Sequence, residues 1–131
     1  MKRKIINPWT WQDRLGFVQA NEISSNQRVL LCAGQTSMDA EGNPRHAEDM
    51  RAQITLVLDN LETILAQSDL NLSNVMRLNY YTTDVDRFFK EYDAITKRLE
   101  TAGCQPASTL LGVQRLAFPE LLIEIEATAI A

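Results

Sequence analysis

A chain of 131 residues with 45% hydrophobic and 23% charged residues has the composition of one globular domain, which excludes a disordered chain and a membrane protein. The formal net charge is −4, and the largest basic cluster is the triplet Lys2-Arg3-Lys4. Because affinity for nucleic acid comes mainly from phosphate neutralisation, this balance speaks against a nucleic-acid partner. We expect a single domain over residues 1–131 that binds neither nucleic acid nor membrane.

The N-terminus, the cysteines and the single histidine narrow the class further. Asn7 and Pro8 interrupt a short basic and apolar start well before the length that a signal peptide requires, so we expect a cytoplasmic protein. Cys32 and Cys104 are far apart and form no C-x-x-C pair, which predicts reduced, buried thiols. His46 lies in a polar stretch and is expected at the surface, and no further imidazole is present for a metal site.

The first third of the chain predicts strands. Residues 17–24 and 28–34 flank the turn-forming residues 25–27, which is typical of a β-hairpin. Residues 29–33 are apolar at every position, a pattern that favours a central strand. A short additional strand over residues 2–6 is compatible with the pattern.

Apolar residues at three- and four-residue spacing predict a first helix from about Ala47. Glu48 and Asp49 are expected in its first turn, where carboxylates suit the helix dipole. Residues 74–82 then alternate between apolar and polar side chains, as a strand with one buried face does.

A second helix is predicted from Val85 to about Thr101, with Thr83 or Asp84 as N-cap and Gly103 just beyond its end. Two further strands follow. The order of strands and helices is that of an α+β sandwich with both helices on one face of a sheet. Because the other face must also be covered, we expect burial against another subunit.

The last strand carries the most prominent candidate site. Glu124 and Glu126 alternate with Ile123, Ile125 and Ala127, so both carboxylates share one face. On the residues alone this face is either solvated or the lining of a cleft. Gly34 is a second candidate, since a glycine lets the backbone approach a ligand closely. The five glycines form no phosphate-binding loop.

The chain resembles the Rid (YjgF) family of small reactive-imine deaminases from about Asn7 to the C-terminus, in the order and spacing of several short segments. The segments that carry the resemblance are Gly16-Phe17-Val18-Gln19, Ala33-Gly34-Gln35, Asp49–Leu61, Thr83–Phe88, Pro106-Ala107, Arg115-Leu116 and Ile123–Ala127.

This resemblance implies a chorismate-mutase-like fold, in which a mixed sheet carries two helices on one face, and a homotrimer with a small-molecule cleft at each subunit interface. It also implies hydrolysis of a reactive imine with no metal or organic cofactor. In this family, water adds to the C=N carbon of a small 2-imino acid and ammonia is released. Glu124 matches the glutamate that holds the water, and Gly34 lies where backbone groups contact the ligand.

Three positions depart from the family pattern. The family's Pro-Ala-Arg is Pro106-Ala107-Ser108 in this chain, so one neutral hydroxyl replaces a bidentate guanidinium. Hydrogen bonds to charged groups contribute roughly 1.5–3 kcal/mol each, so affinity for a carboxylate falls about tenfold to a thousandfold. Phe17 replaces a tyrosine and Tyr92 an asparagine, which removes a hydroxyl and closes space.

These departures leave two functions open. In the first, which we favour, Glu124 still activates water for an imine or enamine that is larger, less acidic or bound by another cation such as Arg14. In the second, the fold is a ligand-binding or regulatory protein without turnover. The ribonuclease label sometimes given to the family finds no support in an acidic chain with one histidine. The expected cleft contains Phe17, Gly34, Tyr92, Ser108, Leu110 and the catalytic Glu124, with Glu126 structural.

Overall fold

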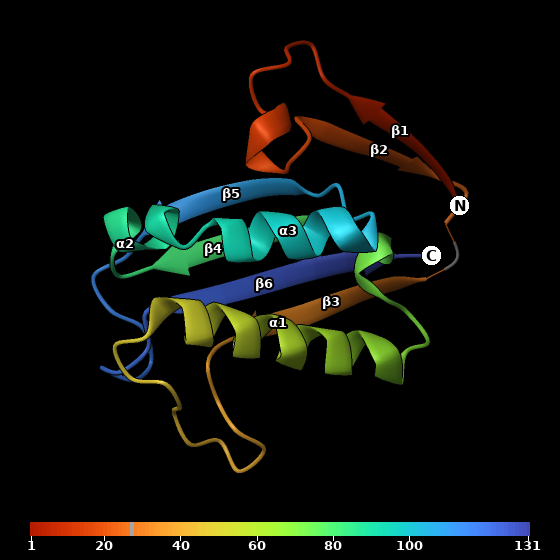
Figure 1. Ribbon diagram of the computed structural model, residues 1–131. Helices are drawn as coiled ribbons and strands as arrows, with labels where there is room; N and C mark the ends of the chain where they lie inside the picture. The colour runs from red at the N-terminus through yellow and green to blue at the C-terminus, as the bar shows by residue number, and fades with distance from the viewer. Residues whose placement is uncertain (27) are drawn as a thin grey trace.

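The computed structural model describes residues 1–26 and 28–131 and has two layers, a sheet and the helices that cover one of its faces (Figure 1). The chain also contains two short 3₁₀ helices, η1 (Asp13–Leu15) and η2 (Leu72–Asn74). The strands and α-helices are, in order, β1 (Lys2–Ile6), β2 (Ala20–Ser24), β3 (Val29–Gln35), α1 (Met50–Gln67), β4 (Val75–Thr82), α2 (Val85–Lys90), α3 (Asp93–Ala102), β5 (Ala107–Gly112) and β6 (Ile123–Ile130).

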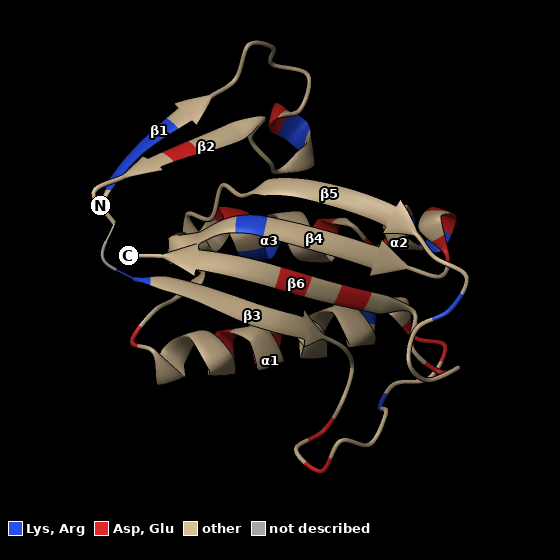
Figure 2. Cartoon of the chain, turned by 180° about the vertical axis from the view of Figure 1, so that it is seen from behind, with Lys and Arg blue, Asp and Glu red and all other residues tan. Residues whose placement is uncertain are grey.

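The main sheet has the strand order β3-β6-β4-β5, in which β4 and β5 are parallel and the other pairs antiparallel. Helices α1 and α3 lie on the same face of this sheet. Figure 2 shows that none of the described helices covers the other face, hereafter the open face. The α+β architecture with helices on one face is therefore confirmed. The core lies between the two layers, where Ile54, Leu61, Ile95 and Ile123 are fully buried.

Helix α1 forms where the apolar spacing predicts, but it begins at Met50 rather than near Ala47. Asp49 is its N-cap and accepts a hydrogen bond from the Ala52 amide at 3.0 Å. Glu48 has a positive φ of 61°, which no helical residue adopts. Both acidic residues expected in the first turn therefore precede the helix. Asp49 still stabilises the first turn, because a capping carboxylate accepts a hydrogen bond from an amide of that turn.

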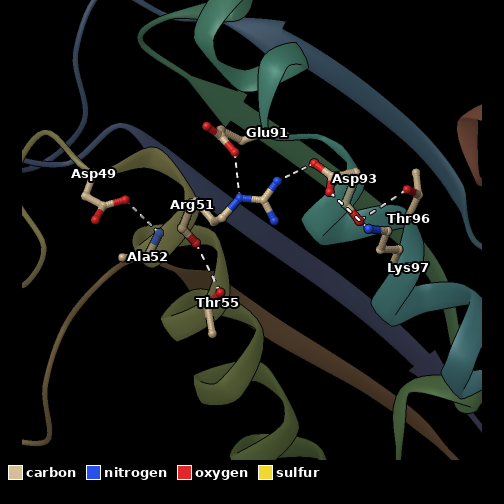
Figure 3. Close-up of polar contacts among 8 residues, drawn as sticks. All are labelled: Asp49, Arg51, Ala52, Thr55, Glu91, Asp93, Thr96 and Lys97. Atoms are coloured by element: carbon tan, nitrogen blue, oxygen red, sulfur yellow. Dashed lines mark hydrogen bonds and ion pairs between the residues drawn. The ribbon is translucent and has the colours of Figure 1, made fainter.

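The second predicted helix is divided into α2 and α3, with a break at Glu91 and Tyr92. Figure 3 shows Arg51 of α1 reaching this break, where it pairs with Glu91 at 2.6 Å and with Asp93. The prediction of one continuous helix was wrong because these contacts and the inward turn of Tyr92 stabilise the interruption. Both predicted ends are confirmed: Asp84 caps α2, and Gly103 ends α3 with a φ of 67°.

The predicted hairpin of residues 17–24 and 28–34 is not formed, because β2 pairs with β1 and β3 pairs with β6. Gln27 of the expected turn lies outside the described residues. Polar contacts attach this segment to the main sheet instead. The Asn21 side-chain amide of β2 donates to the Met76 carbonyl of β4 at 2.8 Å, and the Val18 amide, before β2, donates to the Pro106 carbonyl, before β5, at 2.9 Å. The short strand predicted over residues 2–6 is confirmed as β1.

Strand β3 is an edge of the main sheet rather than the predicted central strand. Successive side chains of a strand point to opposite faces, so its apolar residues divide between the two faces. Cys32 is buried, whereas Val29 and Leu31 are exposed by 53% and 76% on the open face. The prediction of buried, reduced thiols is confirmed, since Cys32 and Cys104 are both free and buried. Within the described part of the chain, no helix is long and apolar enough to span a membrane.

Candidate functional site

Two carboxylates mark the open face of the main sheet. Along β6 the residues Ile123 and Ile125 are buried, and the intervening Glu124 and Glu126 point the opposite way, as the alternation predicts. The acidic positions of β6 lie in the middle of the open face, next to the basic position of β4 (Figure 2).

Glu124 lies directly over Gly34 of the neighbouring strand. A Cβ atom added to Gly34 would come within 2.6 Å of Glu124 Oε2 and 2.8 Å of its Cδ. The register of β3 on β6 shifts between Cys32 and Gln35, and this bulge places the glycine beneath the carboxylate. The structure therefore brings together two of the six predicted cleft residues, and it explains why the space over Gly34 must stay free of a side chain.

The surroundings of Glu124 favour its protonated form. Partial burial raises the pKa of this carboxyl, and the negative charge of Glu126 raises it further. A carboxyl group whose pKa moves toward neutrality can both accept and return a proton. Of the two carboxyls on this face, Glu124 is therefore the one whose protonated form is favoured.

Glu126 has the opposite environment. In the pairing of β4 with β6, Tyr81 lies across from Glu124 and Asn79 across from Glu126. The Asn79 side-chain amide donates to Glu126 Oε1 at 2.9 Å, and the Tyr81 hydroxyl donates to the same oxygen. These two bonds lower the pKa of Glu126, so it is held as a carboxylate.

Phe17 lies in a different region, a hollow of about 540 Å³ between the η1 segment and the second half of α3. Trp11 packs edge-on against its ring at a centroid distance of 5.9 Å. Leu99 and Cys104 form part of the apolar lining, whereas Arg14 and Glu100 are charged lining residues. Arg14, the alternative cation suggested by the sequence, thus shares this hollow with Phe17.

Tyr92 lies on the helix-covered side of the sheet. Its ring packs against Phe88 at 5.2 Å and Tyr80 at 6.4 Å between centroids, and its hydroxyl donates to the Leu15 carbonyl at 2.6 Å. Burial raises the pKa of Tyr92 to about 12. Its hydroxyl is therefore neutral and engaged within the chain.

Ser108 and Leu110 project from β5 toward the helices. They pair with Leu78 and Tyr80 of β4, which are buried on the helix-covered face, and neighbouring residues in register share a face. The six predicted residues therefore separate into two groups within one chain. Glu124 and Gly34 lie on the open face, whereas Phe17, Tyr92, Ser108 and Leu110 lie on the helix side.

Sequence reasoning missed the roles of Asn79 and Tyr81 as hydrogen-bond donors to Glu126. The alternation of residues 74–82 placed both on one face, together with Arg77, which donates to Thr109 at 3.1 Å. Their contact with Glu126 depends on the register of β4 against β6, for which the sequence carries no local signal. Among the described residues, no group of three or more His, Cys, Asp or Glu side chains could hold a metal ion.

Comparison with known proteins decides the family. The family model described as Endoribonuclease L-PSP matches residues 13–131. The chain belongs to this family. Across the family, a RutC family protein of Pyrococcus horikoshii is 30% identical over 100 residues, covering 76% of this chain and 77% of its own length. Protein DfrA of Myxococcus xanthus is 27% identical over 132 residues, covering 100% of this chain and 98% of its own length.

Among solved structures of the family, YyfB from Yersinia pestis, described as a member of the conserved Rid protein family, has a TM-score of 0.87 and 36% identity. The match covers 100% of both chains. The resemblance to the Rid (YjgF) family, carried in the sequence by short segments between Gly16 and Ala127, is thereby confirmed.

Proposed function

We propose that this protein hydrolyses a reactive imine or enamine, adding water at the C=N carbon and releasing ammonia. The observation that carries the proposal is the position of Glu124: its carboxyl lies over Gly34 on the open face and has a raised pKa. A partly buried carboxyl on an uncovered face is a group that can activate water.

The reaction needs one group that moves a proton twice. Glu124 takes a proton from water as the water oxygen bonds to the imine carbon. The electron pair of the C=N π bond moves to nitrogen, and Glu124 gives that proton to the nitrogen, which forms a carbinolamine. When the intermediate collapses, Glu124 takes the hydroxyl proton and gives a proton to the nitrogen. The C–N bond then breaks, the carbonyl forms, ammonia leaves and the carboxylate returns to its initial state.

We further propose that the cleft forms between subunits of a homotrimer, with a small-molecule ligand at each interface. The separation of the predicted residues onto two sides of one chain supports this assembly, because a second copy can bring its helix-side residues to Glu124. The open face also exposes Val29, Leu31 and Leu111 by 53%, 76% and 50%. Apolar exposure gathered on one face is typical of an interface.

The substrate proposed for this site is neutral or bulkier than a small 2-imino acid. Ser108 stands at the position of the family arginine and can form a neutral hydrogen bond in place of a bidentate ion pair. The Phe17 hollow offers Arg14 as a cation, so a substrate with a more distant anionic group also fits the proposal.

The term endoribonuclease in the family's description is not proposed as the activity of this chain. RNA binding depends on cationic surface, and the chain has a formal net charge of −4. His46 is exposed in the loop before α1, on a different element from the carboxylates of β6.

The enzyme proposal predicts ammonia release from a panel of freshly generated imines, measured by a coupled assay. Ser108→Arg is expected to raise the rate on 2-iminopropionate about tenfold or more, because it restores the carboxylate fork. Ser108→Met is the matched control, with similar length and no charge. If no imine is turned over and Ser108→Arg is also inactive, the protein is a ligand-binding module without catalysis.

Gly34→Ala is expected to separate stability from activity. The added methyl group would overlap the flexible end of Glu124, so the carboxyl must turn away while the backbone stays in place. Since a 1 Å misplacement of a catalytic group can cost about 100-fold, ammonia release should fall by that order with a nearly unchanged thermal midpoint.

The matched control for this substitution is Gly112→Ala. Gly112 lies on β5, away from the Glu124 carboxyl, and a Cβ added there would meet Val85 Cγ2 at 3.0 Å. Equal activity in the Gly34 and Gly112 variants would contradict the role given to Glu124.

A further inference from the structure

Glu124 and Glu126 share one face of β6 but have different neighbours. The Tyr81 hydroxyl and the Asn79 amide both donate to one atom, Glu126 Oε1, the amide at 2.9 Å. Within residues 1–26 and 28–131, no hydrogen bond to the Glu124 carboxyl accompanies its contact with Gly34. Two donors thus fix Glu126, whereas Glu124 is free to turn toward a bound molecule.

The charged and titratable groups on this face come from two strands. They are Glu124 and Glu126 of β6 and Arg77 and Tyr81 of β4. The charge of Arg77 also lowers the pKa of Glu126, but less than either hydrogen bond does. The described residues of the flanking strands that face the same side do not ionise: Val29, Leu31 and Ala33 of β3, and Thr109 and Leu111 of β5.

These contacts drive the proton affinities of the two carboxyls apart. Hydrogen bonds from Tyr81 and then Asn79 lower the pKa of Glu126, because charge-assisted bonds favour the ionised form. Burial and then the charge of Glu126 raise the pKa of Glu124. Paired carboxyls in unequal environments take different roles in acid–base chemistry.

We propose, building on the hydrolytic function above, that Glu126 is a positioning residue: hydrogen bonds from Tyr81 and Asn79 hold it as a carboxylate, and its charge makes Glu124 the proton carrier of the pair. When water adds to the C=N carbon, its proton goes to Glu124, and the same carboxyl later gives a proton to the leaving nitrogen. Glu126 exchanges no proton during the cycle, and Tyr81 keeps its own.

The direct test is a ¹³C NMR titration of the glutamate carboxyl carbons in the full-length protein, with Glu124→Gln used to assign the Glu124 signal. In Glu126→Gln the Glu124 titration should move to lower pH, because a neighbouring negative charge is removed. In Tyr81→Phe the Glu126 titration should move to higher pH, because one donor to its carboxylate is lost. A Glu124 titration that stays in place in Glu126→Gln overturns the inference.

Glu22→Gln is the matched control. It removes an exposed carboxylate from β2, which belongs to the other sheet, and should leave the Glu124 titration unmoved. Glu126→Gln retains an oxygen that accepts from Tyr81 and Asn79, so the protein should still fold, which circular dichroism checks.

The pH dependence of kcat/KM on an imine substrate gives a second measurement. In Glu126→Gln the acid limb should move to lower pH together with the Glu124 titration, whereas a purely structural role for Glu126 would lower the rate at every pH without moving the limb. The two measurements also separate the proposals. If the Glu124 titration moves in Glu126→Gln but the protein turns over no imine, the coupling between the two carboxyls stands and the proposed hydrolysis is overturned. If the protein turns over an imine but the Glu124 titration does not move, the hydrolysis stands and the coupling is overturned.

Discussion

Replacing Glu124 by Gln is expected to lower ammonia release about 100- to 10,000-fold, the range that removal of a general acid–base group produces. Glutamine keeps the size of the side chain but cannot take a proton from water. The loss should appear in kcat, because the group acts on the bond changes rather than on binding the substrate. Steady-state assays at several pH values measure it.

The same substitution should not destabilise the protein at neutral pH. Burial and the charge of Glu126 raise the pKa of Glu124 in the folded state. Its contribution to stability is therefore full at low pH, below the pKa of the unfolded chain, and is lost as the pH rises through the raised folded pKa. Above that pH the variant should melt at the same temperature as the wild type or higher.

Thermal melts at acidic and neutral pH, compared with Glu22→Gln, distinguish this result from general damage. The control removes an exposed carboxylate on β2 and should match the wild type in both rate and melting. Turnover that survives in Glu124→Gln would leave the proposed hydrolysis without its acid–base group.

Local patterns in the sequence predicted those parts of the fold that depend on local physics. The alternation along β6 gave the face of Glu124, and Asp84 and Gly103 marked helix ends because capping involves residues within one turn. The break between α2 and α3 was missed because Arg51, which pairs with Glu91 in the break, comes from another helix.

Strand pairing depends on distant residues, and the sequence predicted it poorly. The signal for a hairpin between β2 and β3 was local, but Asn21 anchors β2 to the carbonyls of Met76 and Gln105, far along the chain. For the candidate site, periodicity placed the carboxylates on one face. The contact of Glu124 with Gly34 required the bulge in β3, which no period reveals.

Leu31→Asp is expected to separate the proposed homotrimer into monomers. Leu31 is 76% exposed on the open face of the single chain, and burying a leucine side chain contributes about 1.5–3 kcal/mol. An aspartate at this position would place a further charge in each of the three interfaces, in the hollow that Glu126 also lines, and burying such an ion costs several kcal/mol. The open face would then stay in water.

Light scattering on the eluting protein measures the outcome. Three copies of the 14.8 kDa chain weigh about 44 kDa, and the variant should elute with the mass of one. Ala66→Asp is the control, because Ala66 is exposed on α1, a helix that carries none of the predicted cleft residues. It should leave the trimer intact.

Since one chain keeps Glu124 and Ser108 on opposite sides of its sheet, the Leu31→Asp monomer should also lose ammonia release while keeping the contact between Glu124 and Gly34. A monomeric wild type would remove the proposed interface cleft and the site with it. A monomeric variant that retains full activity would show that the cleft is complete within a single chain.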